Sequence, residues 1–422
     1  MLENTQSLLP IAPGGQRLQV LSVGIDDESL DELARLLGTL GVDPVARLIV
    51  HTRSIHPGTY LGKGKIEEVK VQLEARGAHA VIVDVDLSPN QLKNLEEAIG
   101  KPVLDRQGVI IEIFSRHART KESKTQVELA KLQYLLPRLM HFWTHFERQR
   151  GGIGNKGMGE KQIEVDRRLV KNRMSILRGR LTEIEKERQV QRSGRRDVLK
   201  VALVGYTNAG KSTLLNALTE SRVLAEDKLF ATLDASVRAL DPDCHPPVVA
   251  IDTVGFISRL PPGLVASFRS TLEELHQADL LLHVVDGSSP LAREQMQVTE
   301  KVLEELGVGA TPRIVVLNKM DQLGDGAARI QARVIFPGAE RISALSREDV
   351  RRLRDRVLSH FRQNLEVYEL LVPFAESRMH AMIHAHGSVE VSREVEKGMF
   401  YRVRMDGEWA GKLGLKRFVL GA

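Results

Sequence analysis

Cysteine is almost absent from this sequence of 422 residues: Cys244 is the only one, so no intramolecular disulfide can form. A single cysteine fits a reducing compartment. No run of about 18 apolar residues is present, so the sequence predicts no membrane-spanning helix. The first residues lack a basic segment followed by a long apolar one, so we expect no secretory signal and a cytoplasmic location.

Positive charge is present in excess, but only in one segment. Apolar residues make up 42% and charged residues 27%, a globular composition, and the formal net charge is only +5. Residues 116–197 hold 21 basic and 10 acidic side chains, an excess of +11, so the other 340 residues together carry −6. Such asymmetry indicates a nucleic-acid or anionic-membrane partner.

Alternating strand-like and helix-like segments predict an α/β domain over residues 18–115, after a mobile leader over residues 1–17. This alternation is typical of a largely parallel sheet. The expected strands are 18–25, 45–50, 80–85 and 102–104, and the expected helices are 28–40, 64–75 and 88–99.

Residues 116–197 predict two long helices around a glycine-rich break, and the simplest arrangement is a basic antiparallel hairpin with a glycine-rich tip loop. Each helix has one apolar stripe with steps of three and four residues. Residues 151–159 are too rich in glycine for a helix, and Pro137 kinks or ends the first helix. The stripes are Leu132, Leu135, Leu136, Leu139, Trp143 and Phe146, then Ile163, Val170, Met174, Leu177, Leu181 and Ile184.

Residues 198–363 again alternate strands with helices, which predicts a second α/β domain. Residues 364–422 predict a small α+β domain, with a helix over 375–386. Its expected strands are 369–372, 389–391 and 400–403.

A phosphate-binding loop follows the strand expected over residues 200–204. The residues Gly205-Tyr206-Thr207-Asn208-Ala209-Gly210-Lys211-Ser212 match G-x4-G-K-[ST], and Thr213 continues into a helix. Backbone N–H groups of such a loop and the positive end of the helix bind phosphate oxygens. We expect Lys211 to reach the β- and γ-phosphates and Ser212 to bind Mg²⁺. The alternative is a chance match on an ordinary turn.

A second strand, over residues 248–251, ends in Asp252-Thr253-Val254-Gly255. A carboxylate at this place can hold Mg²⁺ through water, and Gly255 leaves room for the γ-phosphate and can donate its N–H. Between the two motifs, Thr232 is the expected hydroxyl ligand that completes the Mg²⁺ shell; the alternative is a packing or turn threonine. We therefore expect Lys211, Thr232 and Gly255 to act in catalysis.

Asn318-Lys319-Met320-Asp321 follows a third strand and predicts the base. Asp321 can accept hydrogen bonds from guanine N1–H and the exocyclic amino group, whereas adenine would leave this carboxylate unpaired. The stem of Lys319 can pack over the base. The backbone of Ser343-Ala344-Leu345 can contact guanine O6. Alone, the first segment could be a solvated turn and the second carries no information. In this order after the two earlier motifs, they predict GTP and GDP as ligands.

These elements in this order resemble the translation-factor-like P-loop GTPases. Residues 230–234 and 252–257 narrow the resemblance to the Obg–HflX group, and residues 61–65, 151–154 and 159–168 resemble the HflX family itself. The resemblance implies a GTPase, with some ATP binding, that binds the 50S subunit near the peptidyl-transferase centre. It implies splitting or rescue of 70S ribosomes under stress, with 23S rRNA as partner.

The chain departs from the family pattern at two places. The expected tip loop lacks the family's proline, which leaves its rigidity and its rRNA contacts open. Ala235 replaces the family's proline just after the segment that contains Thr232, which is the first switch. Phe256 stands where Ras-like enzymes have a glutamine, so we expect slow intrinsic hydrolysis that the ribosome stimulates. Asn208 resembles the asparagine of K⁺-activated GTPases; alternatively, it only satisfies the loop backbone.

The basic hairpin leaves several readings of its partner open. We expect phosphate contacts to RNA from Arg148, Arg150, Lys156 and Lys161. An ordinary solvated helix face is the alternative, and peripheral membrane association is least favoured because no lipidation motif is present. The function expected is ribosome splitting by a monomer, or otherwise a GTP-gated checkpoint of large-subunit assembly without splitting.

Overall fold

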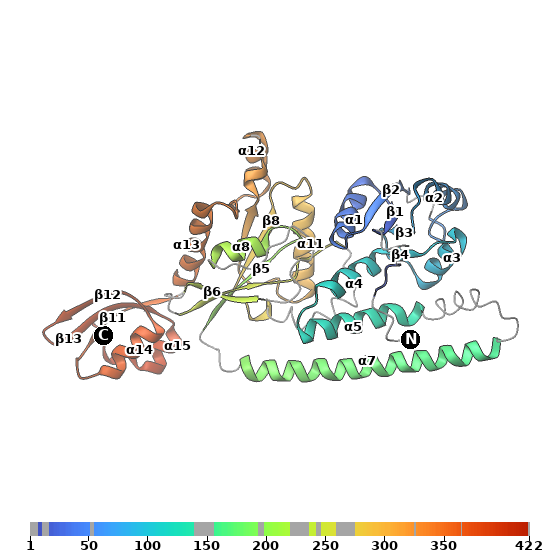
Figure 1. The fold of residues 1–422 in the computed structure, drawn as a ribbon. Coiled ribbons are helices and arrows are strands. Elements are labelled where there is room, and N and C mark those ends of the chain that lie inside the picture. Colours follow the sequence, from blue (N-terminus) through green and yellow to red (C-terminus); the bar gives the residue numbers. More distant parts are fainter. Residues whose placement is uncertain are drawn as a thin grey trace. The chain divides into compact units, whose positions relative to one another are not determined.

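The structure, a computed structural model, describes residues 7–10, 17–50, 55–138, 156–192, 198–219, 236–241, 246–258, 275–324, 326–363 and 365–420 (Figure 1). Within residues 156–192, side chains are described from 164 to 187. The chain forms two compact units. The first comprises Met1–Gln189, Glu226–Asp234 and Ser258–Thr271, and the second Val190–Ala225, Ala235–Ile257 and Leu272–Ala422. Across the described part, none of the helices combines the length and apolarity that crossing a bilayer requires.

A four-stranded parallel sheet in the order β2-β1-β3-β4 forms the N-terminal part. All of the predicted strands and helices are present, with ends shifted by one or two residues. The elements are β1 (Gln19–Gly24), α1 (Asp27–Thr39), β2 (Asp43–Ile49), α2 (Lys63–Arg76), β3 (Ala80–Val83), α3 (Pro89–Ile99), β4 (Val103–Asp105) and α4 (Arg106–His117).

Helix α4 was not predicted from the sequence. Its residues from Val109 to Phe114 are all buried, so the segment has no amphipathic period to read. Asp105 caps it by accepting a hydrogen bond from the Gly108 N–H. The helix begins directly after β4, so its first residue, Arg106, lies at the carboxyl end of the parallel sheet.

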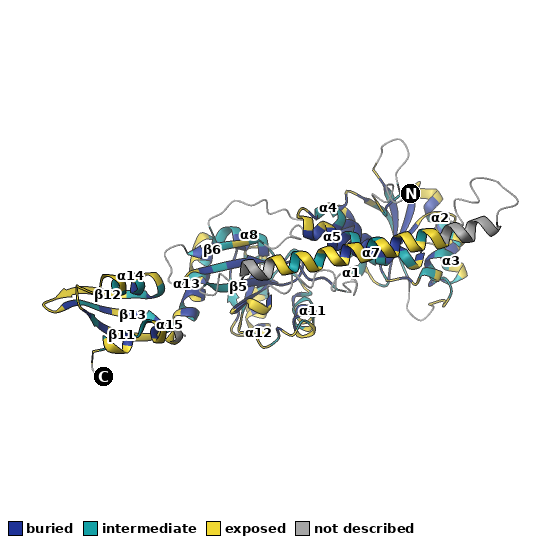
Figure 2. Ribbon diagram, turned by 90° about the horizontal axis from the view of Figure 1, so that it is seen from below, coloured by how far each residue is buried: buried dark blue, intermediate teal, exposed yellow. Residues whose placement is uncertain are grey.

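Helices α5 (Lys121–Leu135) and α7 (Lys156–Arg192) pack through part of their predicted apolar stripes. The predicted stripe residues Leu139, Trp143 and Phe146, and the side chain of Ile163, lie outside the described residues. Leu132 of α5 shares a core with Met174 and Leu177 of α7, and Leu177 is fully buried. The first helix ends at Leu135 and is followed by a 3-10 turn, η4 (Leu136–Arg138), which contains Pro137. Most of α7 outside this stripe is exposed (Figure 2).

The glycine-rich break was predicted over residues 151–159, and the position of its C-terminal end is wrong. Helix α7 begins at Lys156, so Gly157 and Gly159 are helical. Each glycine costs only about 1 kcal/mol relative to alanine in a helix, and the long segment that follows can offset that cost. Residues 151–155 lie outside the described residues.

A six-stranded sheet in the order β10-β9-β8-β5-β7-β6 forms the larger part of the second unit. All pairs are parallel except β6 with β7. Helices α8 and α13 pack in one core cluster against it, while α11 and α12 contribute to another. The elements are β5 (Leu199–Val204), α8 (Lys211–Leu218), β6 (Ser236–Asp241), β7 (Val248–Asp252), η5 (Leu275–Gln277), β8 (Leu280–Asp286), α11 (Ala292–Glu305), β9 (Arg313–Asn318), η6 (Met320–Gln322), α12 (Gly326–Ile335), β10 (Glu340–Arg341) and α13 (Arg347–Gln363).

The C-terminal part is a three-stranded antiparallel sheet in the order β11-β13-β12. The predicted helix near residues 375–386 and the three predicted strands are present, and the strands are longer than expected. The elements are β11 (Glu366–Val372), α14 (Ser377–His386), β12 (Ser388–Val395), β13 (Gly398–Met405), α15 (Gly407–Leu413) and η7 (Leu415–Arg417).

Candidate nucleotide-binding site

Two glycines allow the loop between β5 and α8 to lie close to its neighbours. Gly205 has a φ of 151°, and a Cβ there would lie 2.1 Å from the Val284 carbonyl oxygen of β8. Gly210 has a φ of 89°, and its Cβ would lie 2.2 Å from Asn318 Nδ2. Both conformations and both distances exclude a larger residue. The loop between β5 and α8 therefore requires glycine at both positions, as the predicted phosphate-loop motif has it.

Lys211, the first residue of α8, folds back over the loop. Its Nζ donates hydrogen bonds to the carbonyl oxygens of Gly205 (3.1 Å) and Tyr206 (2.9 Å). Burial lowers the pKa of Lys211 to about 8, and the charge of Asp252 only partly opposes this. A buried ammonium with carbonyl partners alone has more to gain from an anion than an exposed lysine would.

The end of β7 lies beside the same lysine. Ser212 Oγ donates a 2.7 Å hydrogen bond to Asp252 Oδ2, so a hydroxyl and a carboxylate already lie together. A Cβ on Gly255 would lie 2.8 Å from Thr207 Cγ2 and 3.1 Å from Lys211 Nζ. The structure therefore places Lys211, the Ser212–Asp252 pair and Gly255 close together.

Asn318, at the end of β9, links the phosphate loop to the segment after β10. Its Nδ2 donates to the Ala209 carbonyl oxygen, and its Oδ1 accepts from the Ala344 N–H, each over 2.9 Å. The side chain is 2% exposed. Removing the amide would leave both partners without this link, so Asn318 organises the loops on either side.

The residues expected to contact the base lie around this link. Lys319 has a left-handed backbone, with a φ of 61°, and its Nζ lies 2.9 Å from Asp286 Oδ2. Asp321 is exposed. The Ser343 N–H donates to Asp349 (2.9 Å), and Leu345 is 78% exposed. The segment 343–345 is thus held by its backbone while the Leu345 side chain points away from the protein core.

Other predicted site residues are placed only in part. Tyr206, Thr207, Asn208 and Ala209 lie in the loop, with Thr213 in α8 and Thr253 and Val254 after β7. Thr232, Arg148 and Arg150 lie outside the described residues. The backbone of Lys156 and Lys161 lies in the first turns of α7, not in a loop, and their side chains are not described.

Sequence reasoning missed a buried histidine beneath the phosphate loop. His283 of β8 pairs in register with Val204 and is fully buried. Neither ring nitrogen has a hydrogen-bond partner within the described part of the chain. Burial, followed by the charges of Arg313 and Lys211, lowers its pKa to about 4, so it is neutral at pH 7. A histidine within an otherwise apolar strand was the only available signal.

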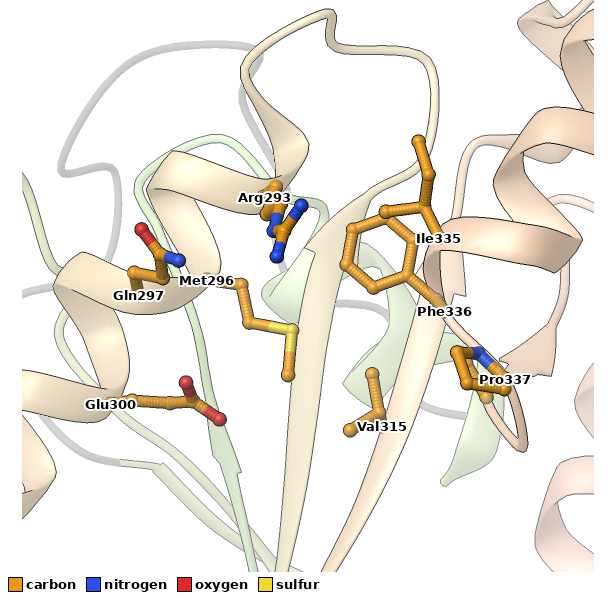
Figure 3. Close-up of a pocket in the computed structure, with 9 residues that line it drawn as sticks. Arg293, Met296, Gln297, Glu300, Val315, Ile335, Phe336 and Pro337 are labelled. Carbon is orange, nitrogen blue, oxygen red and sulfur yellow. The ribbon is translucent and has the colours of Figure 1, made fainter.

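A pocket elsewhere in this unit contains none of the predicted residues. It lies between α11, β9 and the residues that follow α12 (Figure 3). Its apolar lining includes Met296, Val315 and Phe336, and its charged residues are Arg293 and Glu300. The nucleotide motifs therefore point to a different place from this pocket.

Comparisons with known proteins agree with the motifs. A family model described as "GTP-binding GTPase N-terminal" matches residues 27–115, and one described as "GTP-binding GTPase Middle Region" matches 117–195. A third, "50S ribosome-binding GTPase", matches 200–319. A GTPase HflX from Caldanaerobacter subterraneus is 42% identical over 406 residues, covering 95% of this chain and 92% of its own.

The chain belongs to the HflX family of GTPases. The family member from Escherichia coli K12 is 41% identical over 384 residues, covering 90% of both chains. A solved GTP-binding protein from Sulfolobus solfataricus, in complex with GDP, is 26% identical with a TM-score of 0.43, covering 82% of this chain and 99% of its own. The HflX resemblance inferred from the motifs is confirmed.

Proposed function

We propose that this protein binds GTP with Mg²⁺ and couples its binding and hydrolysis to the splitting of ribosomes into subunits. The observation that carries the proposal is the convergence of the nucleotide motifs at one sheet edge, through Lys211, the Ser212–Asp252 pair and the Asn318 link. The matching family model is described as a 50S ribosome-binding GTPase, which favours the large subunit as partner.

In this proposal, each motif has one part of the nucleotide to bind. Lys211 exchanges its two carbonyl partners for the β- and γ-phosphates. Gly255 donates its N–H to the γ-phosphate, and Asp321 accepts hydrogen bonds from guanine. The backbone of residues 343–345 contacts guanine O6, and Thr232 remains the candidate in the first switch.

The donor set fits Mg²⁺. The hydroxyl of Ser212 and the carboxylate of Asp252 are oxygen ligands, and they lie 2.7 Å apart at the loop. Ser212 would hold the ion directly and Asp252 through water. When bound, Mg²⁺ would neutralise charge on the phosphate oxygens.

Phe256 bears on the rate of hydrolysis. It is 3% exposed, and its backbone N–H donates to the Gly205 carbonyl oxygen (3.1 Å). An apolar side chain cannot orient an attacking water, so intrinsic hydrolysis is slow and needs help from the ribosome. Asn208 has a left-handed backbone, with a φ of 61°. In this proposal its side chain coordinates K⁺; the alternative is that it satisfies the loop backbone.

Turnover of GTP in KCl and in NaCl, each with and without 50S subunits, tests these two statements. We expect K⁺ and the ribosome each to raise kcat. Asn208→Asp or Asn208→Ala should remove the difference between the two salts, while Asn216→Ala, in the same unit, serves as the matched control. Equal rates in all four conditions would contradict both statements.

The exposed face of α7 supports RNA as the partner. Arg167, Arg168 and Lys171 are exposed, as are Arg178 and Arg180 further along the helix. Only Val170, Met174 and Leu177 are buried among residues 164–187. A long helix that presents cations away from its one packed stripe can bind the phosphates of rRNA.

Charge-neutral substitution tests this interface. Replacing all four of the predicted contact residues with glutamine should abolish ribosome binding and leave the affinity for GDP unchanged. Ribosome binding by the wild-type protein should weaken steeply as the salt concentration rises. Retained binding would refute the RNA role. The substituted residues are Arg148, Arg150, Lys156 and Lys161. The control set, exposed cations spread over the chain, is Arg35, Lys101, Lys301 and Lys397.

Sucrose gradients distinguish splitting from the alternative function. Purified 70S ribosomes are incubated with the protein and a non-hydrolysable GTP analogue. Conversion to 30S and 50S subunits supports splitting. Co-migration with 50S precursors alone, with 70S particles intact, would instead support a checkpoint of large-subunit assembly.

A further inference from the structure

A buried ionic cluster lies at the carboxyl end of the N-terminal sheet. Arg106 is 1% exposed and Asp84 is fully buried, and Arg106 Nη1 donates to Asp84 Oδ1 over 2.6 Å. Arg106 Nη2 pairs with Glu32 of α1. Burial alone would lower the pKa of Arg106, but the charges of Asp84 and Glu32 raise it by more, so the guanidinium stays charged.

The backbone that carries Arg106 is held by a second buried cluster. Asp105 Oδ1 accepts hydrogen bonds from the Gly108 N–H (2.9 Å) and from the Tyr134 hydroxyl (2.8 Å). Asp105 Oδ2 accepts from Arg138 Nη2 over 3.1 Å. The Arg106 guanidinium is therefore presented from a rigid helix start.

This cluster binds one residue that is distant in sequence. Arg106 Nη2 donates to the carbonyl oxygen of Ser258 (3.2 Å) and to its Oγ (3.1 Å). Ser258 Oγ donates to Glu32 Oε2 over 2.9 Å. In open α/β sheets, the carboxyl ends of the strands are where ligands bind. Here the chain itself supplies the occupant.

Ser258 lies only three positions after Gly255. The division between the two compact units falls between Ile257 and Ser258, so Ser258 belongs to the unit that contains Arg106. On the other side of that division, the Thr207 N–H donates to the Phe256 carbonyl oxygen over 2.6 Å. Two Cα steps, at most about 7 Å, join Phe256 to Ser258. The chain between Phe256 and Ser258 is therefore too short for one of them to move far while the other stays in place.

Gly255 lies close to the Lys211 ammonium, which the γ-phosphate would approach. A Cβ added to Gly255 would lie 2.8 Å from Thr207 Cγ2 and 3.1 Å from the ammonium of Lys211. For the γ-phosphate to lie between the Lys211 ammonium and the Gly255 N–H that donates to it in the proposed function, the segment from Gly255 to Phe256 must move away from Lys211. Because the connection is short, such a movement would displace Ser258 and strain its contacts with Arg106 and Glu32.

We propose that Arg106 and Glu32 form a positioning clamp on Ser258, which holds the segment after Gly255 and transmits the state of the nucleotide to the start of α4. The clamp rests on the proposed role of Gly255 at the γ-phosphate. It opposes triphosphate more than diphosphate, because only the γ-phosphate displaces Gly255. The coupling is reciprocal, so losing the clamp favours triphosphate.

The test uses the full-length chain carrying Ser258→Ala, which removes the Oγ contacts and keeps the backbone one. The affinity for a non-hydrolysable GTP analogue relative to GDP should rise at least threefold, a ratio that a general loss of stability would not change. Glu32→Gln should also raise the affinity for the analogue relative to GDP. Ser29→Ala, in α1, is the matched control and should leave this ratio unchanged. An unchanged ratio in both Ser258→Ala and Glu32→Gln overturns the proposal.

Hydrogen exchange gives a second readout. In the wild type, the analogue should increase exchange in the first turn of α4 relative to the GDP complex, and Ser258→Ala should remove at least half of that increase. An identical change in wild type and variant, or none in the wild type, overturns the clamp. Failure of the protein to bind GDP at all would instead contradict the proposed nucleotide site.

Discussion

The buried ammonium of Lys211 predicts that nucleotide binding takes up protons. Without nucleotide, the pKa of Lys211 is lowered to about 8 because the group is buried with only carbonyl partners and Asp252 nearby. Phosphate oxygens on Nζ would favour the charged form and return the pKa to about 10.5 or above. Between these two values the bound protein carries a proton that the free protein has lost.

The size of the effect follows from the lowered pKa of about 8. In the free protein, Lys211 would be about half neutral at pH 8 and about one-tenth neutral at pH 7. Binding of GDP should therefore take up about 0.5 proton at pH 8 and about 0.1 proton at pH 7. The affinity should be about tenfold weaker at pH 9 than at pH 7.

Titration calorimetry with GDP in two buffers of different ionisation enthalpy measures this uptake directly. The apparent binding enthalpy should differ between the buffers at pH 8 and nearly coincide at pH 7. A binding enthalpy that is independent of buffer at pH 8 would show that Lys211 is charged before the nucleotide arrives. That result would refute the argument from burial.

Three further predictions concern single side chains. Gly255→Ala places a Cβ 2.9 Å from the Thr207 Cα, which cannot give way cheaply, so the free protein should lose about 1–3 kcal/mol of folding free energy in denaturant titrations; unchanged stability would contradict this. His283 has a pKa of about 4, so the unfolded chain binds more protons between pH 6.5 and 4, and acidification through that window should cost about 3 kcal/mol of folding free energy. His283→Leu should remove that loss in denaturant titrations at pH 7 and pH 4.5, and equal losses in both proteins would disprove it. Leu177→Ala should cost about 2–5 kcal/mol in the packing of α5 on α7, seen as faster hydrogen exchange in α7; Leu169→Ala, at a site 46% exposed, is the control and should have little effect.

The sequence predicts this fold and site wherever local pattern and local chemistry agree. The N-terminal strands and helices alternate with clear periods, and the phosphate loop follows its strand as its glycines require. Helix α4 could not be predicted because burial on all sides removes its period. The Arg106–Ser258 contact joins residues 152 positions apart, and no pairwise signal in one sequence marks it. Likewise, nothing local shows that Gly157 joins the helix that follows it.

Within the motif Asn318–Asp321, the affinity for any nucleotide and the preference for guanine depend on different residues. One amide contacts both Ala209 in the phosphate loop and Ala344 after β10, so its loss would loosen the grip on any nucleotide, whatever its base. Asp321 is exposed, and a substitution there leaves that link intact. Selection or design could therefore change the preferred base by substituting Asp321. A substitution of Asn318 would instead weaken the binding of every nucleotide.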